Sequence, residues 1–310
     1  MFKISQHVLT KQLLKSVLYL STASILLACA SIYKVEQCYS SKDEVWSEQV
    51  KSLTKQAWPY AVMAASAYGY TPYKTLPEGF IAGAQEPNHR GLAYSVFTRG
   101  NADNPEEIII AFRGSEHFSP REFYYDWIAG NIFGTQNKPA LRAYEKVIKD
   151  YKAKTKNIPV TVTGHSLGGG LSTHVSLNTP NAKAYVFNSS PRFWNIENAE
   201  NERFSIAEYG DPLKVLRIFG PEPTQLYTSI NCQPGLNLSF NHSMKAMSDC
   251  LIGIAAESGD KQAIAFLKLG GQTVQTETLP QKTSLEHSGK QTHYSDKTFE
   301  TCKAGNTKSF

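Results

Sequence analysis

The feature of this sequence that most constrains its fold is a short apolar segment that runs into a glycine-rich turn. Residues 160–163 alternate β-branched valines with threonines, which favours a short buried strand. Gly164, Ser166 and Gly168 follow in the spacing G-x-S-x-G, which places a serine on a strained strand-to-helix turn. Glycines two residues before and two residues after the serine remove side chains that would clash in such a turn. The pattern therefore predicts a strand, a turn that carries the serine, and a helix over residues 167–177.

The start of that helix is expected to stabilise negative charge. Backbone N–H groups at a helix N-terminus can hold an oxyanion, and the N–H group of Leu167 lies directly after the serine. A second donor is expected from Ser115, which follows an apolar strand and can donate from both its backbone and its hydroxyl group. The alternatives are a glycine-rich turn that enters a packed helix and, for Ser115, an ordinary turn at the end of a strand.

Strands and helices are expected to alternate along the chain. A strand is expected over residues 107–113, where residues 108–112 form a continuous apolar run that is typical of a strand covered on both faces. Residues 138–152 have the periodicity of an amphipathic helix. The alternation predicts an α/β fold with a mostly parallel central sheet flanked by helices. The other expected strands cover residues 92–98, 183–188 and 203–208, and the other expected helices cover residues 43–68, 246–256 and 261–269.

A serine becomes a nucleophile when a histidine takes its proton and a carboxylate orients that histidine. On turns of this kind the three residues follow in the order serine, acid, histidine. Asp211 lies in a Gly-Asp-Pro turn, and His242 lies beyond a loop-rich region, just before an expected helix. We therefore expect Ser166 as the nucleophile, Asp211 as the acid and His242 as the base, although Gly-Asp-Pro is also ordinary turn chemistry. The alternative histidines are His174, His287 and His293, and the alternative acids are Glu208, Glu222 and Asp249.

Short motifs occur in a characteristic order along the chain. They are Ala111-Phe112-Arg113-Gly114-Ser115, Asp126-Trp127-Ile128, Gly164-His165-Ser166-Leu167-Gly168-Gly169, Asn188-Ser189-Ser190-Pro191-Arg192 and Gly210-Asp211-Pro212. In this order, over roughly residues 50–250, the sequence resembles class 3 (fungal-type) lipases. The resemblance implies an α/β-hydrolase that acts on acyl esters. Carried over by position, it implies the same roles for Ser166, Asp211 and His242, and an oxyanion hole formed by Ser115 and Leu167.

The N-terminus looks like a processing signal. A basic segment with three lysines and no acidic residue precedes apolar residues 16–28, a run too short to span a bilayer as an ordinary helix. The run ends in Leu-Leu-Ala followed by Cys29, which resembles a bacterial lipobox. The resemblance implies cleavage before Cys29 and acylation of that residue. In this resemblance, the alanine that follows the cysteine favours the outer membrane of the cell envelope as the location of the protein. The alternatives are a signal peptide cut elsewhere or an uncleaved anchor.

Lipidation of Cys29 would leave four cysteines, which in an oxidising compartment can pair in three ways. A bridge between Cys232 and Cys250 would brace the segment that carries the candidate base. A bridge between Cys38 and Cys302 would then tie the two ends of the chain together. Free buried thiols are the alternative. None of the spacings is typical of a zinc site, and neither a metal nor a cofactor is expected.

Together these features indicate a membrane-tethered serine acyl-ester hydrolase, namely a lipase, a phospholipase A or a carboxylesterase. Its expected partners are lipid or other acyl-ester substrates and, through the lipid anchor, the membrane. The formal net charge of +5 comes largely from the N-terminal lysines, so no nucleic-acid binding is expected. The alternatives are a thioesterase or amidase with the same three residues, and a non-catalytic surface lipoprotein with a hydrolase-like fold.

The expected organisation has four parts. A signal peptide covers residues 1–28 and a lipidated tether covers residues 29–42. The hydrolase domain covers residues 43–258, and a polar C-terminal extension covers residues 259–310. Within the hydrolase domain, the aromatic-rich residues 118–133 are expected to form either a lid at a lipid surface or a buried amphipathic helix.

Overall fold

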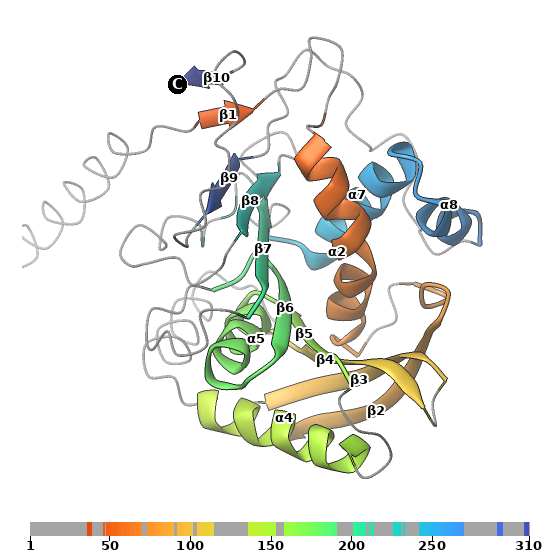
Figure 1. Ribbon diagram of the computed structural model, residues 1–310, viewed down its shortest axis with the longest axis vertical. Coiled ribbons are helices and arrows are strands. Elements are labelled where there is room, and N and C mark those ends of the chain that lie inside the picture. Colours follow the sequence, from red (N-terminus) through yellow and green to blue (C-terminus); the bar gives the residue numbers. More distant parts are fainter. Residues whose placement is uncertain are drawn as a thin grey trace, which may run out of the picture. The chain divides into compact units, whose positions relative to one another are not determined.

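The computed structural model divides into two compact units, one of residues 1–36 with 308–310 and one of residues 37–307. Two short strands, β1 (Glu36–Cys38) and β10 (Thr307–Ser309), form a two-stranded sheet. The fold below is that of the unit of residues 37–307 (Figure 1). The residues that the structure describes are 36–38, 46, 48–69, 73–89, 92–101, 104–114, 136–152, 158–190, 201–208, 211, 213, 226–230, 232, 242–269, 290–293 and 307–309.

The centre of this unit is a sheet of eight strands in the order β2-β3-β4-β5-β6-β7-β8-β9. Neighbouring strands from β4 to β8 are parallel, whereas β2, β3 and β9 join the sheet antiparallel. The prediction of an α/β fold with a mostly parallel central sheet flanked by helices is confirmed. The strands are β2 (Phe80–His89), β3 (Leu92–Gly100), β4 (Pro105–Phe112), β5 (Val160–His165), β6 (Ala182–Phe187), β7 (Arg203–Glu208), β8 (Leu226–Ile230) and β9 (Lys290–His293).

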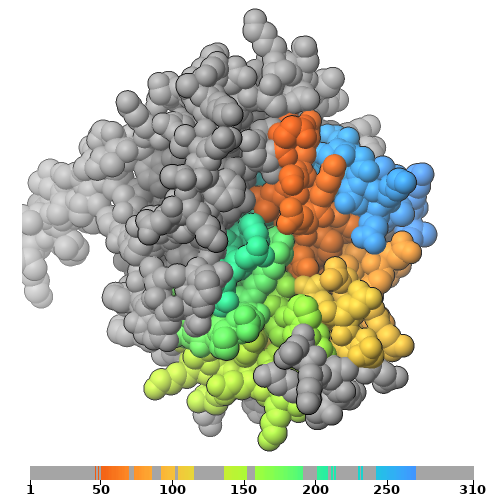
Figure 2. All heavy atoms as spheres, in the orientation of Figure 1, coloured from red at the N-terminus to blue at the C-terminus, as the bar shows by residue number. Residues whose placement is uncertain are grey.

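Helices cover both faces of the sheet. The described helices are α2 (Glu48–Ser66), α4 (Asn137–Lys152), α5 (Leu167–Asn178), α7 (Met244–Glu257) and α8 (Lys261–Lys268). On β4, Ile109 and Ala111 pack in one core with α2, α7 and α8, while Ile108 and Ile110 pack in a second core with α4 and α5. The continuous apolar run of β4 is explained by this burial on both faces. In the space-filling view, α2 (orange) and α8 (blue) lie on the same side of the unit (Figure 2).

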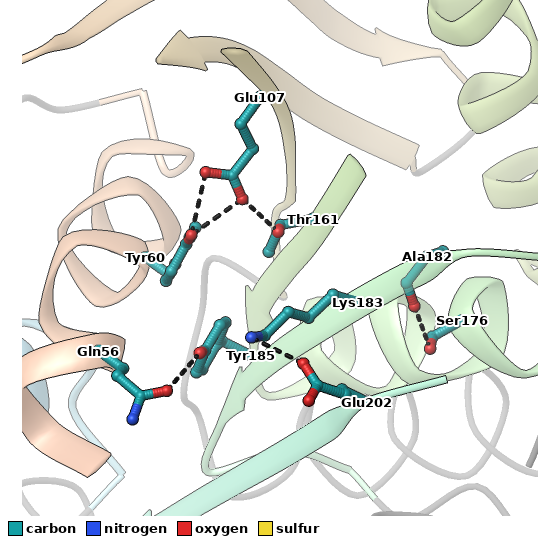
Figure 3. Close-up of polar contacts among 9 residues, drawn as sticks. All are labelled: Gln56, Tyr60, Glu107, Thr161, Ser176, Ala182, Lys183, Tyr185 and Glu202. Atoms are coloured by element: carbon teal, nitrogen blue, oxygen red, sulfur yellow. Dashed lines mark hydrogen bonds and ion pairs between the residues drawn. The ribbon is translucent and has the colours of Figure 1, made fainter. Parts of the chain in front are cut away.

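A buried carboxylate ties α2 to the sheet (Figure 3). Tyr60 on α2 donates its hydroxyl hydrogen to Glu107, with oxygen–oxygen distances of 2.9 Å and 3.1 Å to the two carboxylate oxygens. Thr161 on β5 donates to the same carboxylate at 2.5 Å, and the Arg99 guanidinium lies 3.5 Å away. Burial, and then the negative charge of Glu107, raise the pKa of Tyr60. The hydroxyl therefore stays protonated, and α2 is held against β4 and against β5, the strand that leads to Ser166.

Three strands of the sheet were not expected from the sequence. β2 precedes the first expected strand, β8 lies in the region expected to be rich in loops, and β9 lies in the polar C-terminal segment. With five and four residues, β8 and β9 are too short to show a clear alternation, and their positions are decided by pairing with β7 and with each other. Beyond residue 258, α8 also contributes Ala263 and Phe266 to the core that contains α2 and α7.

Candidate active site

The backbone at Ser166 has the strained turn that its spacing predicts. Ser166 lies between β5 and α5 with φ 56° and ψ −123°. Residues other than glycine rarely have a backbone with such a positive φ. A Cβ atom on Gly164 would lie 2.5 Å from the carbonyl group of Gly168, and a Cβ atom on Gly168 would lie 2.1 Å from the carbonyl oxygen of Phe112. Neither position has room for a side chain, so the close approach of β4, β5 and α5 requires both glycines.

The predicted nucleophile, base and acid meet in one hydrogen-bonded chain. Nε2 of His242 lies 2.9 Å from Oγ of Ser166, and Nδ1 of His242 lies 2.6 Å from Oδ2 of Asp211. All three side chains are buried. A carboxylate accepts hydrogen bonds, so Asp211 holds the hydrogen on Nδ1 and leaves the lone pair of Nε2 for the hydroxyl of Ser166. This arrangement can remove a proton from the serine as its oxygen attacks an electrophile.

Backbone contacts hold the carboxylate in place. The N–H group of Asp211 donates to the carbonyl oxygen of Glu208 at the end of β7, at 3.0 Å. Its Oδ1 atom accepts a hydrogen bond from the N–H group of Leu213 at 2.6 Å. Oδ1 is thereby occupied while Oδ2 faces His242. Asp211 is therefore held by backbone groups on both sides of it and supports the histidine.

The segment that carries His242 is closed by a disulfide bond. Cys232 and Cys250 are joined, with 5.9 Å between their Cα atoms, and His242 lies between them in the sequence. The N–H group of Cys232 donates to the Glu208 carboxylate at 3.1 Å. Glu208, a buried residue at the end of β7, therefore contacts both Asp211 and Cys232, the first cysteine of the disulfide bond. For the other candidate pair, Cys302 and the side chain of Cys38 lie outside the described residues.

The oxyanion-hole candidates are described in part. Leu167 is the first residue of α5, so its N–H group belongs to the helix N-terminus beside Ser166. Ser115 lies outside the described residues, as do the lid candidate, residues 118–133, and Cys29. The preceding residue, Gly114, is described, and a Cβ atom on it would lie 3.3 Å from Cβ of Ser166. The chain therefore passes beside the nucleophile immediately before Ser115.

The alternative acids and bases that the structure describes are engaged elsewhere. Nδ1 of His174 on α5 lies 3.3 Å from the Asn178 side chain. Asp249 accepts a hydrogen bond from Tyr73 and pairs with Lys245, and its burial raises its pKa. Glu208 accepts from the backbone of Cys232, as described above. His287, Glu222 and the side chain of His293 lie outside the described residues.

A second imidazole, to which the sequence analysis assigned no role, lies beside the base. His165 directly precedes Ser166, and its ring centroid lies 4.7 Å from that of His242. Its Nδ1 atom lies 2.7 Å from the hydroxyl oxygen of Tyr68, which follows α2. Burial, and then the neighbouring His242, lower the pKa of His165 well below its usual range, while the backbone of His242 acts in the opposite direction. A histidine directly before the serine was visible in the motif, but its partners depend on the fold.

Within the described part of the chain, no group of three or more His, Cys, Asp or Glu side chains is arranged to hold a metal ion. Similarly, none of the helices described is long and apolar enough to cross a membrane.

The strand order and the site define the class of fold. A serine on a strained turn after a central parallel strand, followed in the chain by an acid and a histidine that converge on it, is the arrangement of α/β-hydrolases. The family model for the Tle-like phospholipase domain matches residues 60–199. That match includes Ser166 and ends before Asp211 and His242. Residues 60–199 are therefore similar to a phospholipase domain, which supports ester hydrolysis as the general chemistry.

Several solved lipases are similar to this chain. The lipase from Rhizopus microsporus var. chinensis has 19% sequence identity and a TM-score of 0.46, covering 64% of this chain and 83% of the lipase. Lipase II from Rhizopus niveus has 16% identity and a TM-score of 0.46, covering 57% and 80% respectively. The Rhizomucor miehei lipase in its propeptide complex has 17% identity and a TM-score of 0.40, covering 60% and 70%. No curated protein matches the sequence significantly. The fold class therefore rests on the strand order and the turn at Ser166.

Proposed function

We propose that this protein is a serine acyl-ester hydrolase with Ser166 as nucleophile, His242 as general base and Asp211 as the acid that orients it. The observation that carries the proposal is the unbroken chain of contacts from Oγ of Ser166 through His242 to Asp211, on a turn that glycines make possible. The match of residues 60–199 to a phospholipase-like domain supports the same chemistry.

The proposed reaction has two halves. Oγ of Ser166 attacks the ester carbonyl carbon while its proton moves to Nε2 of His242, and Asp211 stabilises the imidazolium that forms. The negative charge on the former carbonyl oxygen is held by the N–H group of Leu167 and by Ser115. The imidazolium then gives its proton to the departing alcohol as the carbon–oxygen bond breaks. Water, deprotonated by His242, hydrolyses the acyl-enzyme and restores the serine.

We propose lipids, and phospholipids in particular, as the substrate class. The family model supports a phospholipid, and the lipobox-like end of residues 16–28 supports a location at a membrane. In this proposal Cys29 is acylated and holds the enzyme at the outer membrane of the cell envelope. Labelled palmitate should enter the wild type and be absent from Cys29→Ala, and equal labelling of the two proteins would contradict the anchor.

An activity panel tests the chemistry and the substrate class together. It uses esters of rising acyl length and phospholipid vesicles, with wild type compared to Ser166→Ala. A fluorophosphonate probe, which reacts with activated serines, should label the wild type and not the variant. Turnover should fall by several orders of magnitude in Ser166→Ala, since the three residues act as a unit. Labelling that persists in Ser166→Ala would remove Ser166 as the nucleophile.

A further inference from the structure

His165 lies at the centre of the candidate site without being part of the proton path. It is the last residue of β5, its side chain is 5% exposed, and its ring lies 4.7 Å from that of His242, centroid to centroid, at an angle of 44°. Its Nδ1 atom faces the Tyr68 hydroxyl at 2.7 Å. Its Nε2 atom is buried and has no hydrogen-bond partner among the described residues. A buried polar atom without a hydrogen-bond partner costs free energy, so the presence of this ring beside the proposed base calls for an explanation.

The hydroxyl group of Tyr68 connects this ring to the rest of the site. A Cβ atom on Gly114 would lie 2.5 Å from that hydroxyl oxygen and 3.3 Å from Cβ of Ser166. The hydroxyl is therefore packed between His165 and the segment that leads to Ser115. Through these contacts, Tyr68 and His165 touch the nucleophile turn, the base and the approach to the proposed oxyanion hole.

The surroundings of the His165 ring favour its neutral form. The titratable groups in contact with it are Tyr68 from the turn after α2 and His242, and Asp211 in turn contacts Nδ1 of His242. The Arg113 guanidinium, from the residue after β4, lies near Gly69, the residue that follows Tyr68. Burial and His242 lower the pKa of His165. When the Tyr68 hydroxyl donates to Nδ1, it occupies the lone pair that a second ring proton would need. The neutral ring then carries its hydrogen on Nε2.

We propose that Tyr68 and His165 are a positioning pair. In this pair the Tyr68 hydroxyl keeps His165 as a neutral ring against His242, so that no neighbouring positive charge opposes the formation of the His242 imidazolium. The proposal rests on the proposed function, in which His242 becomes an imidazolium as Ser166 attacks. A positive charge on His165 at this distance would disfavour that imidazolium, because like charges oppose each other strongly in a buried site. Neither Tyr68 nor His165 exchanges a proton with the substrate.

The test compares the pH dependence of single-turnover labelling of Ser166 by a fluorophosphonate in five proteins. These are the wild type, Tyr68→Phe, His165→Asn, the double variant, and Tyr144→Phe as a control with a buried tyrosine on α4. Phenylalanine keeps the ring of Tyr68 but removes the donor. Asparagine keeps an acceptor near the position of Nδ1 but cannot be protonated. Thermal unfolding is recorded for each protein.

In Tyr68→Phe, Nδ1 becomes free to bind a proton. The acidic limb of the labelling rate should therefore move to higher pH by about half a unit or more, and the rates should converge with those of the wild type in alkaline solution. In the His165→Asn background, Tyr68→Phe should move the limb no further, because the titrating ring is gone. Tyr144→Phe should leave the limb in place. A purely structural role for Tyr68 would instead lower the rate by the same factor at every pH.

The proposal is overturned if the limb of Tyr68→Phe coincides with that of the wild type, or if the shift persists in the His165→Asn background. A wild type that is not labelled at Ser166 would remove the proposed function first, and this proposal with it. The wild type gives a measurement that needs no variant, since long-range ¹H–¹⁵N spectra report the protonation of each imidazole nitrogen. At pH 6.5, the ordinary pKa of a histidine, His165 should appear as a neutral ring with its hydrogen on Nε2 rather than half protonated. A hydrogen on Nδ1 would also contradict the pairing with Tyr68.

Discussion

Nε2 of His242 lies 2.9 Å from Oγ of Ser166, although 76 residues separate the two in the chain. Ser166 is presented by the end of β5, and His242 by the segment just before α7. The two meet because α7 packs on α2 and on the same face of the sheet. The hydroxyl of Ser243 caps α7 by accepting from the N–H group of Ala246, which fixes where the helix begins and thus where His242 lies.

The first prediction concerns the base. His242→Ala should lower ester hydrolysis by about 10²–10⁴-fold, the range for a positioned general base, while the protein remains folded. His174→Ala is the control, because His174 is a half-buried histidine on α5 that contacts Asn178. It should stay within about tenfold of the wild type. Steady-state kinetics with circular dichroism measure both. A folded His242→Ala protein that keeps more than a tenth of the turnover would end the assignment.

The second prediction concerns the disulfide bond. Removing it with Cys232→Ala and Cys250→Ala together should lower the free energy of unfolding by about 2–4 kcal/mol, because the bond restricts the unfolded chain over a separation of 18 residues. Turnover should fall as well, since the loop between the two cysteines holds His242. Urea denaturation measures the first effect, and assays well below both melting temperatures measure the second. Unchanged turnover in the destabilised variant would show that the bond serves stability alone.

The third prediction concerns the turn. Gly168→Ala should abolish activity and destabilise the protein, because the new Cβ atom would lie 2.1 Å from the carbonyl oxygen of Phe112 and backbone must move. Gly259→Ala is the contrasting variant: its φ of +83° is unsuited to alanine, but a Cβ atom there meets nothing within 4 Å, whereas Gly168 has the clash without a positive φ. Gly259→Ala should lower the free energy of unfolding only through its strained backbone, by about 1–2 kcal/mol. Equal unfolding free energies for the two variants would show that the clash is absorbed by the surrounding chain.

The fourth prediction concerns stability against pH. The pKa of His165 is lowered in the folded protein, so the unfolded state binds more protons between that value and the ordinary value of 6.5. The free energy of unfolding should rise with pH across this window, by at most about 1.4 kcal/mol per pH unit, and level off above it. Urea denaturation between pH 5 and pH 8 should show this slope in the wild type and a flatter one in His165→Asn.

Asp249 should contribute with the opposite sign, which makes it a useful control. Burial raises its pKa above 3.8 in the folded protein, so there the folded state binds more protons than the unfolded state. Its contribution therefore falls as pH rises from about 4 through the raised value. The slope above pH 5 should become steeper in Asp249→Asn if the raised pKa reaches that range, and never flatter. An unchanged slope in His165→Asn would contradict the assignment of the neutral ring.

The sequence was most informative where local chemistry leaves few options. The G-x-S-x-G spacing predicts the turn at Ser166, because few backbones bring a strand and a helix this close and glycine is needed at both contacts. Burial on both faces makes β4 an apolar run, so it could be predicted without its neighbours. The order of serine, acid and histidine then pointed to Asp211 and His242, which the structure brings together.

Tertiary structure decided the contacts that local sequence does not encode. β8 and β9 are short, and pairing with neighbouring strands places them in the sheet. The disulfide partner of Cys232 was one of several options until α7 placed Cys250 beside it. Tyr68 and His165 lie 97 residues apart, and their hydrogen bond exists because α2 packs on β5. The sequence determines which side chains and turns are available for chemistry. The burial of these side chains and the distances between them are set only when the sheet and its helices have assembled.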